Sequence, residues 1–351
     1  MFNQEVKCIE RDRCQERNDP DGTKPGSRFG TQPRPYPDRL FRHKPGNRIN
    51  DGEAKTKDPV PLGYSASGVV TAVGEGVPNL TPGQKVACYG GPYVRHAEQL
   101  LVPKNLVVPV PERGSLEEAA FVGLGAIAIH ALRKASVSFG ETVVVIGLGI
   151  VGQLVSQIAS VAGCRVLAFD LIPERCNLLR QCCDSAQVAD KIETLETMVW
   201  QETEGIGADS VLLCAKAPDG HLINRALRFL RERGSVIVVG DLKMEFDREL
   251  MFAKEASITV SKAGEPGRTD RIYVKEGVDY PPGLVRWTEG RNMKEFIRLL
   301  DEGRIRLTPL VSGAVTPERA GHAYEMYMAA PEKVMGMLIR FDNNRAESLS
   351  Y

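Results

Sequence analysis

Residues 142–170, TVVVIGLGIVGQLVSQIASVAGCRVLAFD, decide how this chain folds. The run 143–146 is β-branched and has no polar break, which is typical of a parallel strand buried on both faces. Gly147, Gly149 and Gly152 follow with G-x-G-x-x-G spacing. The first glycine permits a tight turn, the second lets a pyrophosphate approach the backbone, and the third lets the helix pack on the strand. The stretch therefore predicts half of a dinucleotide-binding site.

The helix predicted at 150–162 and the acid after the next strand complete this half-site. The helix directs its N-terminal N–H groups and partial positive charge at the phosphates, so we expect Leu148, Ile150 and Val151 to join the three glycines in binding the cofactor. Asp170 ends the next strand, where its carboxylate can accept hydrogen bonds from both ribose hydroxyls and would repel a 2′-phosphate. We therefore expect NAD(H) to be preferred, with NADP(H) as the alternative.

Length, charge and cysteine content define the class of protein. At 351 residues the chain can form two domains, because single cores stop growing at about 250–300 residues. With 45 basic and 45 acidic side chains the formal charge is zero, so we expect a small-molecule substrate and neither a nucleic-acid nor a membrane partner. No apolar run approaches the roughly 18 residues of a membrane span, and the first residues lack a signal-peptide core, which predicts a cytoplasmic protein. The eight cysteines include no C-x-x-C pair and are expected to be reduced, mostly buried thiols.

The amino-acid composition changes after about the first sixty residues. Residues 1–58 hold few large apolar side chains among many charges, prolines and glycines, which predicts an irregular leader, extended or partly disordered. Short strands broken by glycine are then expected at 67–73, 85–88 and 93–102. This pattern predicts a small β-rich domain.

Beyond this region strands alternate with helices. The expected strands lie at 143–146, 165–169, 209–214, 235–239 and 257–261. This alternation predicts an α/β fold with a doubly wound parallel sheet, because a parallel pair of strands needs a long crossover. Cys214 with Ala215, and Val239 with Gly240, end strands at the carboxyl edge, where such sheets bind ligands. We expect these four residues to contact the cofactor.

Several motifs in fixed order identify a family resemblance. The segments GYSASGVVTAVGEGV, PGQKVA, HAEQLLVPKNLVVPVP and VVVIGLGIVG resemble the medium-chain dehydrogenase/reductase superfamily, and the likeness runs from about 59 to 341. It implies a Rossmann domain at 123–290 and a GroES-like, β-rich catalytic domain made of 59–122 and 291–345. The N-terminal part is degenerate, since EVKCI at 5–9 is a weak match to the family's first strand pair. The tail DYPPGLVRWTEGRNMKEFIRLLDEGRI, with PLGYS, is similar to the branch often fused to a second oxidoreductase domain.

The resemblance also shows where this chain departs from the zinc enzymes of the superfamily. Tyr64 stands where those enzymes carry a histidine ligand, and Leu124 falls on the position of a cysteine ligand. In the leader only Cys8 and Cys14 are available for the first ligand, and the four closely spaced cysteines of the structural zinc lobe are missing. A catalytic zinc site needs three protein ligands, so we expect no zinc.

Without a metal, a side-chain acid must handle the proton of the reacting oxygen. Tyr64 is the first candidate because it replaces a metal ligand; the alternative is a buried tyrosine that shapes the pocket. Ser65 is a candidate to orient Tyr64 or the substrate, or else a local hydrogen-bonding residue. His96, in VRHAEQL, is expected to support the cleft more than the chemistry. His130 is a candidate to reach the cofactor, the alternative being a core or interface histidine.

Two further expectations come from the same resemblance. Arg175 matches a position that flanks the adenosine ribose, although a solvated helix arginine is the alternative reading, and 257–261 resembles the edge strand through which family members form homodimers. The predicted function is a zinc-independent NAD(P)(H)-dependent oxidoreductase that interconverts an alcohol and a carbonyl, on a sugar-like or secondary-metabolite substrate. The alternatives are an enone or quinone reductase and a dinucleotide-binding protein without turnover.

Overall fold

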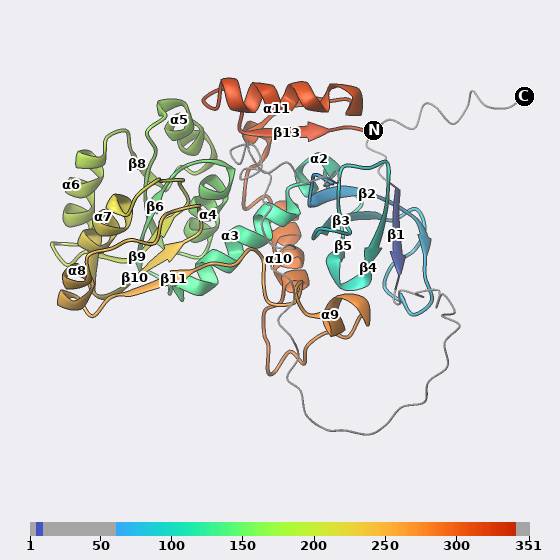
Figure 1. Ribbon diagram of the computed structural model, residues 1–351, viewed down its shortest axis with the longest axis horizontal. Helices are drawn as coiled ribbons and strands as arrows, with labels where there is room; N and C mark the ends of the chain where they lie inside the picture. Colours follow the sequence, from blue (N-terminus) through green and yellow to red (C-terminus); the bar gives the residue numbers. More distant parts are fainter. Residues whose placement is uncertain (1–4, 10–60, 342–351) are drawn as a thin grey trace, which may run out of the picture.

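The computed structural model describes residues 5–9 and 61–341, which form two sheet-based parts with helices between them (Figure 1). The part drawn mostly in green and yellow is the dinucleotide-type sheet with its helices, and the blue strands form the other sheet. Two helices, α3 (Val122–Ala135) and α10 (Glu289–Asp301), lie between the sheets.

The larger sheet is a six-stranded parallel sheet in the order β11-β10-β9-β6-β7-β8. Its strands are β6 (Thr142–Ile146), β7 (Arg165–Phe169), β8 (Gln187–Ala189), β9 (Ala208–Leu213), β10 (Leu230–Val238) and β11 (Ser257–Val260). Its helices are α4 (Ile150–Val161), α5 (Pro173–Cys182), α6 (Ile192–Glu202), α7 (His221–Phe229) and α8 (Arg248–Ala253). The chain leaves the central β6 first toward β7 and later returns to β9 on its other side. The predicted doubly wound parallel sheet is therefore confirmed, and its switch point lies at the carboxyl end of β6.

The second sheet has five strands in the order β4-β1-β2-β3-β5. The strands are β1 (Glu5–Ile9), β2 (Ser65–Val73), β3 (Lys85–Tyr89), β4 (Gln99–Pro103) and β5 (Val107–Pro109), and the short helix η2 (Lys104–Leu106) joins the last two. β1 pairs in parallel with both β2 and β4. The prediction of an irregular leader is therefore wrong for Glu5–Ile9, because two neighbouring strands supply backbone partners that local sequence does not reveal. The rest of that prediction, 10–58, lies outside the described residues.

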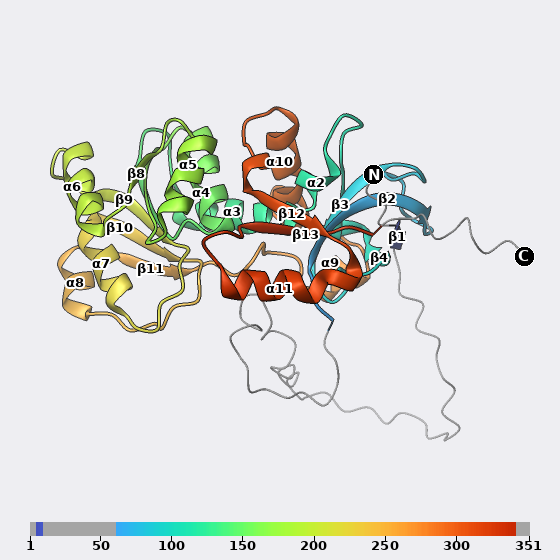
Figure 2. The ribbon, with the colours of Figure 1, turned by 90° about the horizontal axis from the view of Figure 1, so that it is seen from above.

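The last described part of the chain closes one side of the molecule. It contains η3 (Thr308–Leu310), β12 (Val311–Val315), η4 (Pro317–Arg319), α11 (Ala320–Ala329) and β13 (Gly336–Ile339). β12 and β13 pair in parallel, and Figure 2 shows α11 lying along them. The parallel pair requires the crossover that α11 provides.

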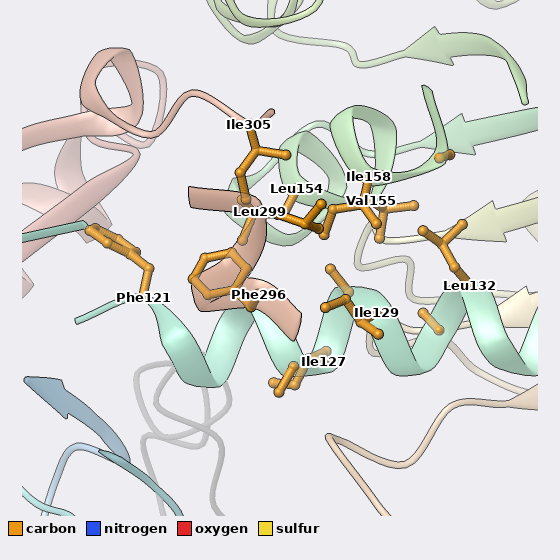
Figure 3. Close-up of a cluster of buried hydrophobic side chains, with 14 of the residues drawn as sticks. Phe121, Ile127, Ile129, Leu132, Leu154, Val155, Ile158, Phe296, Leu299 and Ile305 are labelled. Atoms are coloured by element: carbon orange, nitrogen blue, oxygen red, sulfur yellow. The ribbon is translucent and has the colours of Figure 1, made fainter. Parts of the chain in front are cut away.

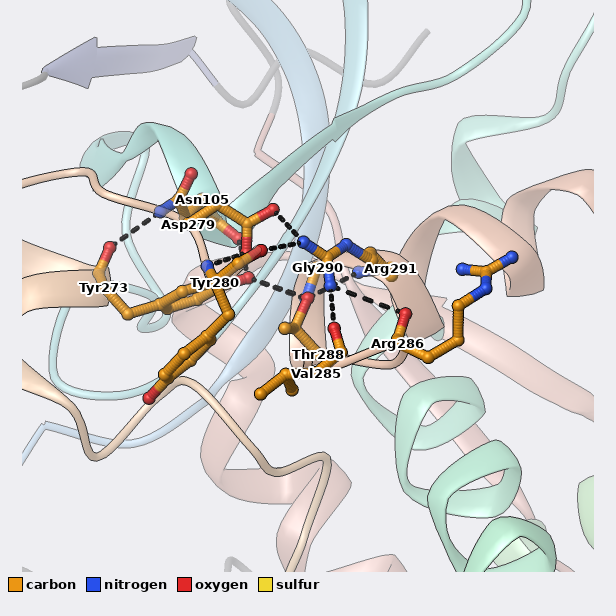
Figure 4. A network of polar contacts seen from close by, with 9 residues as sticks. All are labelled: Asn105, Tyr273, Asp279, Tyr280, Val285, Arg286, Thr288, Gly290 and Arg291. Carbon is orange, nitrogen blue, oxygen red and sulfur yellow. Dashed lines mark hydrogen bonds and ion pairs between the residues drawn. The ribbon is translucent and has the colours of Figure 1, made fainter. Parts of the chain in front are cut away.

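The chain returns to the part that contains β1 to β5 before residue 290, the predicted end of the Rossmann domain. Tyr273 and Val274 of α9 (Arg271–Lys275) pack in the same buried cluster as the residues of β2 and β3. Asn105 donates a hydrogen bond to the Tyr273 carbonyl at 2.8 Å, and Arg291 pairs with Asp279 at 2.7 Å (Figure 4). The Rossmann part therefore ends near β11, because the side chains that follow it bury their apolar surface against the other sheet.

A continuous apolar core joins the two parts through α3. Ile129 and Leu132 of α3 lie in one cluster with Leu154 of α4 and Phe296 of α10 (Figure 3). Burial of each such side chain contributes about 1.5–3 kcal/mol. Gly125 is necessary for this contact, because a Cβ there would lie 2.1 Å from the Phe296 ring.

None of the helices in the described ranges is long and apolar enough to cross a lipid bilayer.

Candidate functional site

The glycine turn between β6 and α4 has the shape that a pyrophosphate requires. Gly147 adopts φ +97°, and a Cβ there would lie 2.5 Å from the Ala215 nitrogen. A Cβ on Gly152 would lie 1.8 Å from the Gly147 oxygen, so both positions require glycine. Gly149, the N-cap of α4, has open space where a Cβ would point. This gap at a helix N-terminus leaves room for phosphate oxygens to approach the backbone.

Asp170 holds the same turn by its carboxylate. Its Oδ2 accepts a hydrogen bond from the Leu148 nitrogen at 2.6 Å, and its Oδ1 accepts one from the Ile172 nitrogen at 2.9 Å. The residue is only 7% exposed. A carboxylate has about four acceptor sites, so these bonds leave capacity for a ribose hydroxyl. Asp170 therefore positions the turn in addition to the predicted ribose contact.

Arg175 lies beside Asp170. Its side chain is mostly buried, which does not agree with the alternative interpretation of a solvated helix arginine. Its Nη1 is 3.6 Å from Asp170 Oδ2, its Nη2 donates to the Pro331 carbonyl at 3.0 Å, and its side chain is 18% exposed. Gln153 supports this arrangement, since its amide nitrogen donates to the carbonyls of Arg175 and Leu148 at 2.8 and 3.2 Å. The sequence reasoning missed Gln153, whose signal is an amide directly after the third glycine, in a helix whose other residues are mostly apolar.

The four strand-end residues predicted to contact the cofactor lie at one edge. The nitrogen of Cys214 donates to the Ile146 carbonyl at 2.8 Å, and the nitrogens of Val239 and Gly240 donate to the Leu213 carbonyl. A Cβ on Gly240 would lie 1.9 Å from the Ala215 oxygen. These close backbone contacts place the carboxyl ends of β9 and β10 beside the glycine turn.

These residues fit a nicotinamide dinucleotide. The open space at Gly149 and the spare acceptor capacity of Asp170 match a pyrophosphate and a ribose, and Leu148, Ile150 and Val151 form the turn and first residues of α4 between them. Such a cofactor supplies a hydride, and the chain supplies orientation and a proton.

A cavity of about 310 Å³ lies where β2, α3, α4 and α11 meet. Its walls include Tyr64, which directly precedes β2, and Ser65, the first residue of β2. They also include His96 from the loop after β3, Leu124 of α3, Ile150 of α4 and Tyr324 of α11. Ile150 is the first residue after the glycine turn, so the cavity reaches the cofactor side. Three of the four predicted catalytic residues are brought together here.

Tyr64 contributes a phenol that stays protonated. Burial raises the pKa of its hydroxyl to about 12, against an opposing effect of the Arg268 charge. Its ring meets the edge of the Tyr89 ring at 5.7 Å between centroids, and its carbonyl accepts a hydrogen bond from the Gly90 nitrogen at 2.8 Å. A neutral phenol with this pKa can donate a proton to a developing alkoxide.

His96 forms a polar pair with a residue from the far end of the chain. Its Nε2 lies 2.8 Å from the Tyr324 hydroxyl, and burial lowers the pKa of its imidazole. Gly63 makes room for the ring, since a Cβ there would lie 2.7 Å from His96 Nδ1. Tyr324 was missed because no motif surrounds it and only the return of α11 brings it to the cavity.

Ser65 and His130 differ from the other two candidates. The Ser65 hydroxyl donates to the Ala120 carbonyl at 2.6 Å and accepts from the Gly123 nitrogen at 2.9 Å, so it joins β2 to the helices. This is the local hydrogen-bonding role that was the alternative to catalysis. His130 does not line the cavity, and burial with the nearby Lys134 lowers its pKa to about 4. That His130 reaches the cofactor stays a prediction, with a core or interface histidine as the alternative.

The described residues do not form the donor set of a zinc site. Tyr64 and Leu124, at the two positions where the zinc enzymes carry ligands, both line the cavity. Among the side chains of residues 61–341 there is no group of three or more His, Cys, Asp or Glu that could hold a metal ion. The side chains of Cys8 and Cys14 lie outside those that the structure describes.

Comparison with known proteins gives one family and several relatives. Residues 151–275 match the zinc-binding dehydrogenase family model. The chain is 25% identical over 307 residues to a probable D-xylulose reductase A of Aspergillus terreus, covering 78% of this chain and 80% of the relative. The fold is similar to a 2R,3R-butanediol dehydrogenase of Bacillus subtilis (TM-score 0.62, 20% identity, 81% of each chain). It is also similar to a protein of Escherichia coli CFT073 described as a short chain alcohol dehydrogenase and complexed with NADH (TM-score 0.62, 18% identity, 80% of this chain and 83% of that one).

Proposed function

We propose that this chain, an NAD(P)-dependent oxidoreductase of the zinc-type alcohol dehydrogenase-like branch of the medium-chain dehydrogenase/reductase superfamily, interconverts an alcohol and a carbonyl without zinc. The observation that carries the proposal is the phenol of Tyr64 in the cavity, at the position of a zinc-ligand histidine in the metal enzymes. A protonated phenol replaces the metal as the group that stabilises negative charge on the substrate oxygen.

The chain's residues divide the reaction into three tasks. The glycine turn, fixed by Asp170, holds the dinucleotide, which supplies the hydride for the carbonyl carbon. Tyr64 gives its proton to the carbonyl oxygen, so the products are the alcohol and the oxidised dinucleotide. The His96–Tyr324 pair lies in the same cavity and can return a proton to Tyr64. In the oxidative direction the same groups act in reverse.

Replacing Tyr64 tests the proton donor. Tyr64→Phe keeps the ring and removes the hydroxyl, so we expect kcat to fall by about 10²- to 10⁴-fold while NADH still binds. Stopped-flow or steady-state assays of NADH consumption measure the rate, and fluorescence titration measures NADH affinity. The control is Tyr89→Phe, because Tyr89 is buried against Tyr64 but does not line the cavity. Wild-type turnover in Tyr64→Phe would remove Tyr64 from the mechanism.

One substrate separates the proposed reaction from enone reduction. With NADH and 2-cyclohexenone, carbonyl reduction gives an allylic alcohol, whereas reduction of the C=C bond gives a saturated ketone. We expect the alcohol, measured by gas chromatography with mass detection. The saturated ketone would establish the enone reductase instead. Binding of NADH without any hydride transfer across a broad panel of carbonyls, alcohols and enones would establish a protein without turnover.

Metal content tests zinc independence directly. We expect the purified full chain to contain far less than one equivalent of zinc and to keep its activity after treatment with a chelator, because Tyr64 and Leu124 offer no ligand nitrogen or thiolate. Elemental analysis by plasma mass spectrometry gives the answer. One equivalent of zinc per chain, lost together with activity, would overturn this part of the proposal.

A further inference from the structure

The walls of the cavity are mostly hydrocarbon. Phe121 and Leu124 come from the start of α3 and Ile150 from α4. Met337 belongs to β13, and Met335 directly precedes that strand. A volume of about 310 Å³ lies at the small end of the range of ligand pockets. Thioether side chains adapt well to flat or ring-shaped partners. The space is therefore suited to a small ring.

Several polar side chains of the wall are already bonded within the protein. Ser65 is bonded to main-chain groups on both sides, and the Ser67 hydroxyl donates to the Leu116 carbonyl at 2.5 Å. The two serine hydroxyls are therefore occupied within the protein. The Glu117 carboxylate accepts a hydrogen bond from Arg340 at 2.7 Å, is 40% exposed and keeps acceptor capacity.

The other polar side chains of the wall include Tyr64, His96, Tyr324 and Tyr327. Gly63 leaves room for the His96 ring, and His96 Nε2 lies 2.8 Å from the Tyr324 hydroxyl. Tyr324 and Tyr327 are close enough to Tyr64 to raise the pKa of its hydroxyl. The described wall thus combines these ring side chains and the partly exposed Glu117 carboxylate with an otherwise apolar lining.

We propose that the substrate presents one oxygen to Tyr64 and a ring-sized hydrocarbon body, alicyclic or aromatic, to the rest of the cavity. This differs from the sugar-like substrate that the sequence indicated. A polyol would bring several hydroxyls against Leu124, Met337 and their neighbours, and each buried hydroxyl without a partner costs about 1–3 kcal/mol. The inference rests on the proposed function, because the single oxygen is the one that gains or loses the proton.

A matched pair of ketones tests the substrate class. Cyclohexanone and a pentahydroxycyclohexanone have the same ring and carbonyl and differ only in hydroxyl groups. With the full chain and NADH or NADPH, we expect kcat/KM for cyclohexanone to exceed that for the hydroxylated ring by more than about 100-fold, since two unsatisfied hydroxyls already account for such a ratio. An equal or inverted ratio would overturn the inference.

Binding separates failure of the inference from failure of the proposed function. Calorimetric titration of the NADH-saturated chain with each ring measures affinity without turnover. Binding of cyclohexanone but not of the hydroxylated ring, with no hydride transfer to either, would contradict the proposed function and still support an apolar site. Binding of neither ring, or of the hydroxylated ring alone, would overturn the inference.

A change in the wall provides the second test. Leu124→Asn places an amide in the cavity at nearly constant volume, so the ratio of kcat/KM between the two rings should fall at least about tenfold. The control is Leu101→Asn on β4, since Leu101 is half-exposed and outside the cavity. Should Leu124→Asn not fold, Met337→Gln makes the same change from β13. An unchanged ratio in the folded variants would count against the apolar wall as the source of selectivity.

Discussion

Asp170 fixes the glycine turn by its carboxylate. Its oxygens accept hydrogen bonds from the backbone nitrogens of Leu148 and Ile172, and the Arg175 guanidinium lies 3.6 Å away. We propose that the same carboxylate selects the cofactor, because its charge would repel a 2′-phosphate. The proposal connects the stability of the turn to the choice of cofactor.

Two substitutions at Asp170 separate these effects. Asp170→Asn removes the charge and keeps one of the two acceptors, so the preference for NADH over NADPH should fall by about 10- to 100-fold. One backbone N–H then faces the amide nitrogen, which should cost about 1–3 kcal/mol in the free energy of unfolding. Asp170→Ala also leaves the Leu148 nitrogen without its acceptor and should cost a further 1–3 kcal/mol, roughly, in the free energy of unfolding. Fluorescence titrations with both cofactors and denaturant unfolding give the two quantities.

The control for both is Asp184→Asn, at a side chain that is 80% exposed in the same part of the molecule. It should change neither quantity. A wild-type protein that binds NADPH more tightly than NADH would contradict the role given to Asp170.

At the scale of elements, the packing of α3 on α10 depends on a missing side chain. Gly125→Ala would place a methyl group 2.1 Å from the Phe296 ring, which has no open space to move into at 0% exposure. We expect a loss of about 1–3 kcal/mol, despite the higher helix propensity of alanine. Chemical denaturation monitored by circular dichroism measures it.

Gly321→Ala in α11 is the matched control for this clash. A Cβ at Gly321 meets nothing within 4 Å, so helix propensity alone should act and the variant should gain up to about 1 kcal/mol. An unchanged free energy of unfolding in Gly125→Ala would show that α3 and α10 can move apart to accommodate the methyl group. It would contradict the requirement for glycine at this contact.

The first turn of α10 contains a buried acid that makes stability depend on pH. Glu289 is 0% exposed, and burial raises the pKa of its carboxyl to about 8, with Arg268 opposing the shift. Between the unfolded pKa of about 4.5 and 8, the folded protein keeps a proton that the unfolded chain releases. The free energy of unfolding should therefore fall as the pH rises through this window, by a few kcal/mol at most.

Glu289→Gln removes this titration, so the variant should match wild type near pH 5 and exceed it near pH 8. Urea unfolding at several pH values measures the difference. Glu276→Gln, at an exposed position on the same side of the molecule, is the control and should leave the pH profile unchanged. A wild-type profile in Glu289→Gln would show that the carboxyl is ionised in the folded state.

At the scale of the whole molecule, β11 is one of the two edge strands of the six-stranded sheet, and we propose that two chains pair there. Val260 of β11 is 57% exposed. Around a two-fold axis, Val260→Lys places like charges at the interface, so a dimer should become a monomer. Light scattering after size-exclusion chromatography measures the mass.

Val278→Lys adds the same charge at a side chain of equal exposure, 56%, away from that edge. It should leave the dimer intact. A wild-type monomer, or dissociation by the control alone, would contradict pairing through β11.

The sequence predicted those helices, strands and turns that depend on patterns of a few neighbouring residues. The strand, glycine turn and helix from 142 to 161 form where expected because β-branched runs, glycine spacing and helix periodicity act within a few residues. The same locality predicted Asp170 at the end of its strand. The alternation of strands and helices along the chain was enough to predict the doubly wound parallel sheet.

Only the tertiary structure decided which side chains line the cavity. Tyr324 reaches His96 across more than two hundred residues, and α9 returns to the catalytic sheet after β11. β1 becomes a strand only because β2 and β4 lie on either side of it. Such contacts depend on where separate elements meet in space, which no local pattern encodes. The sequence by itself therefore determined the glycine turn and the acid that follows the next strand, and the assembled fold decided which side chains line the cavity.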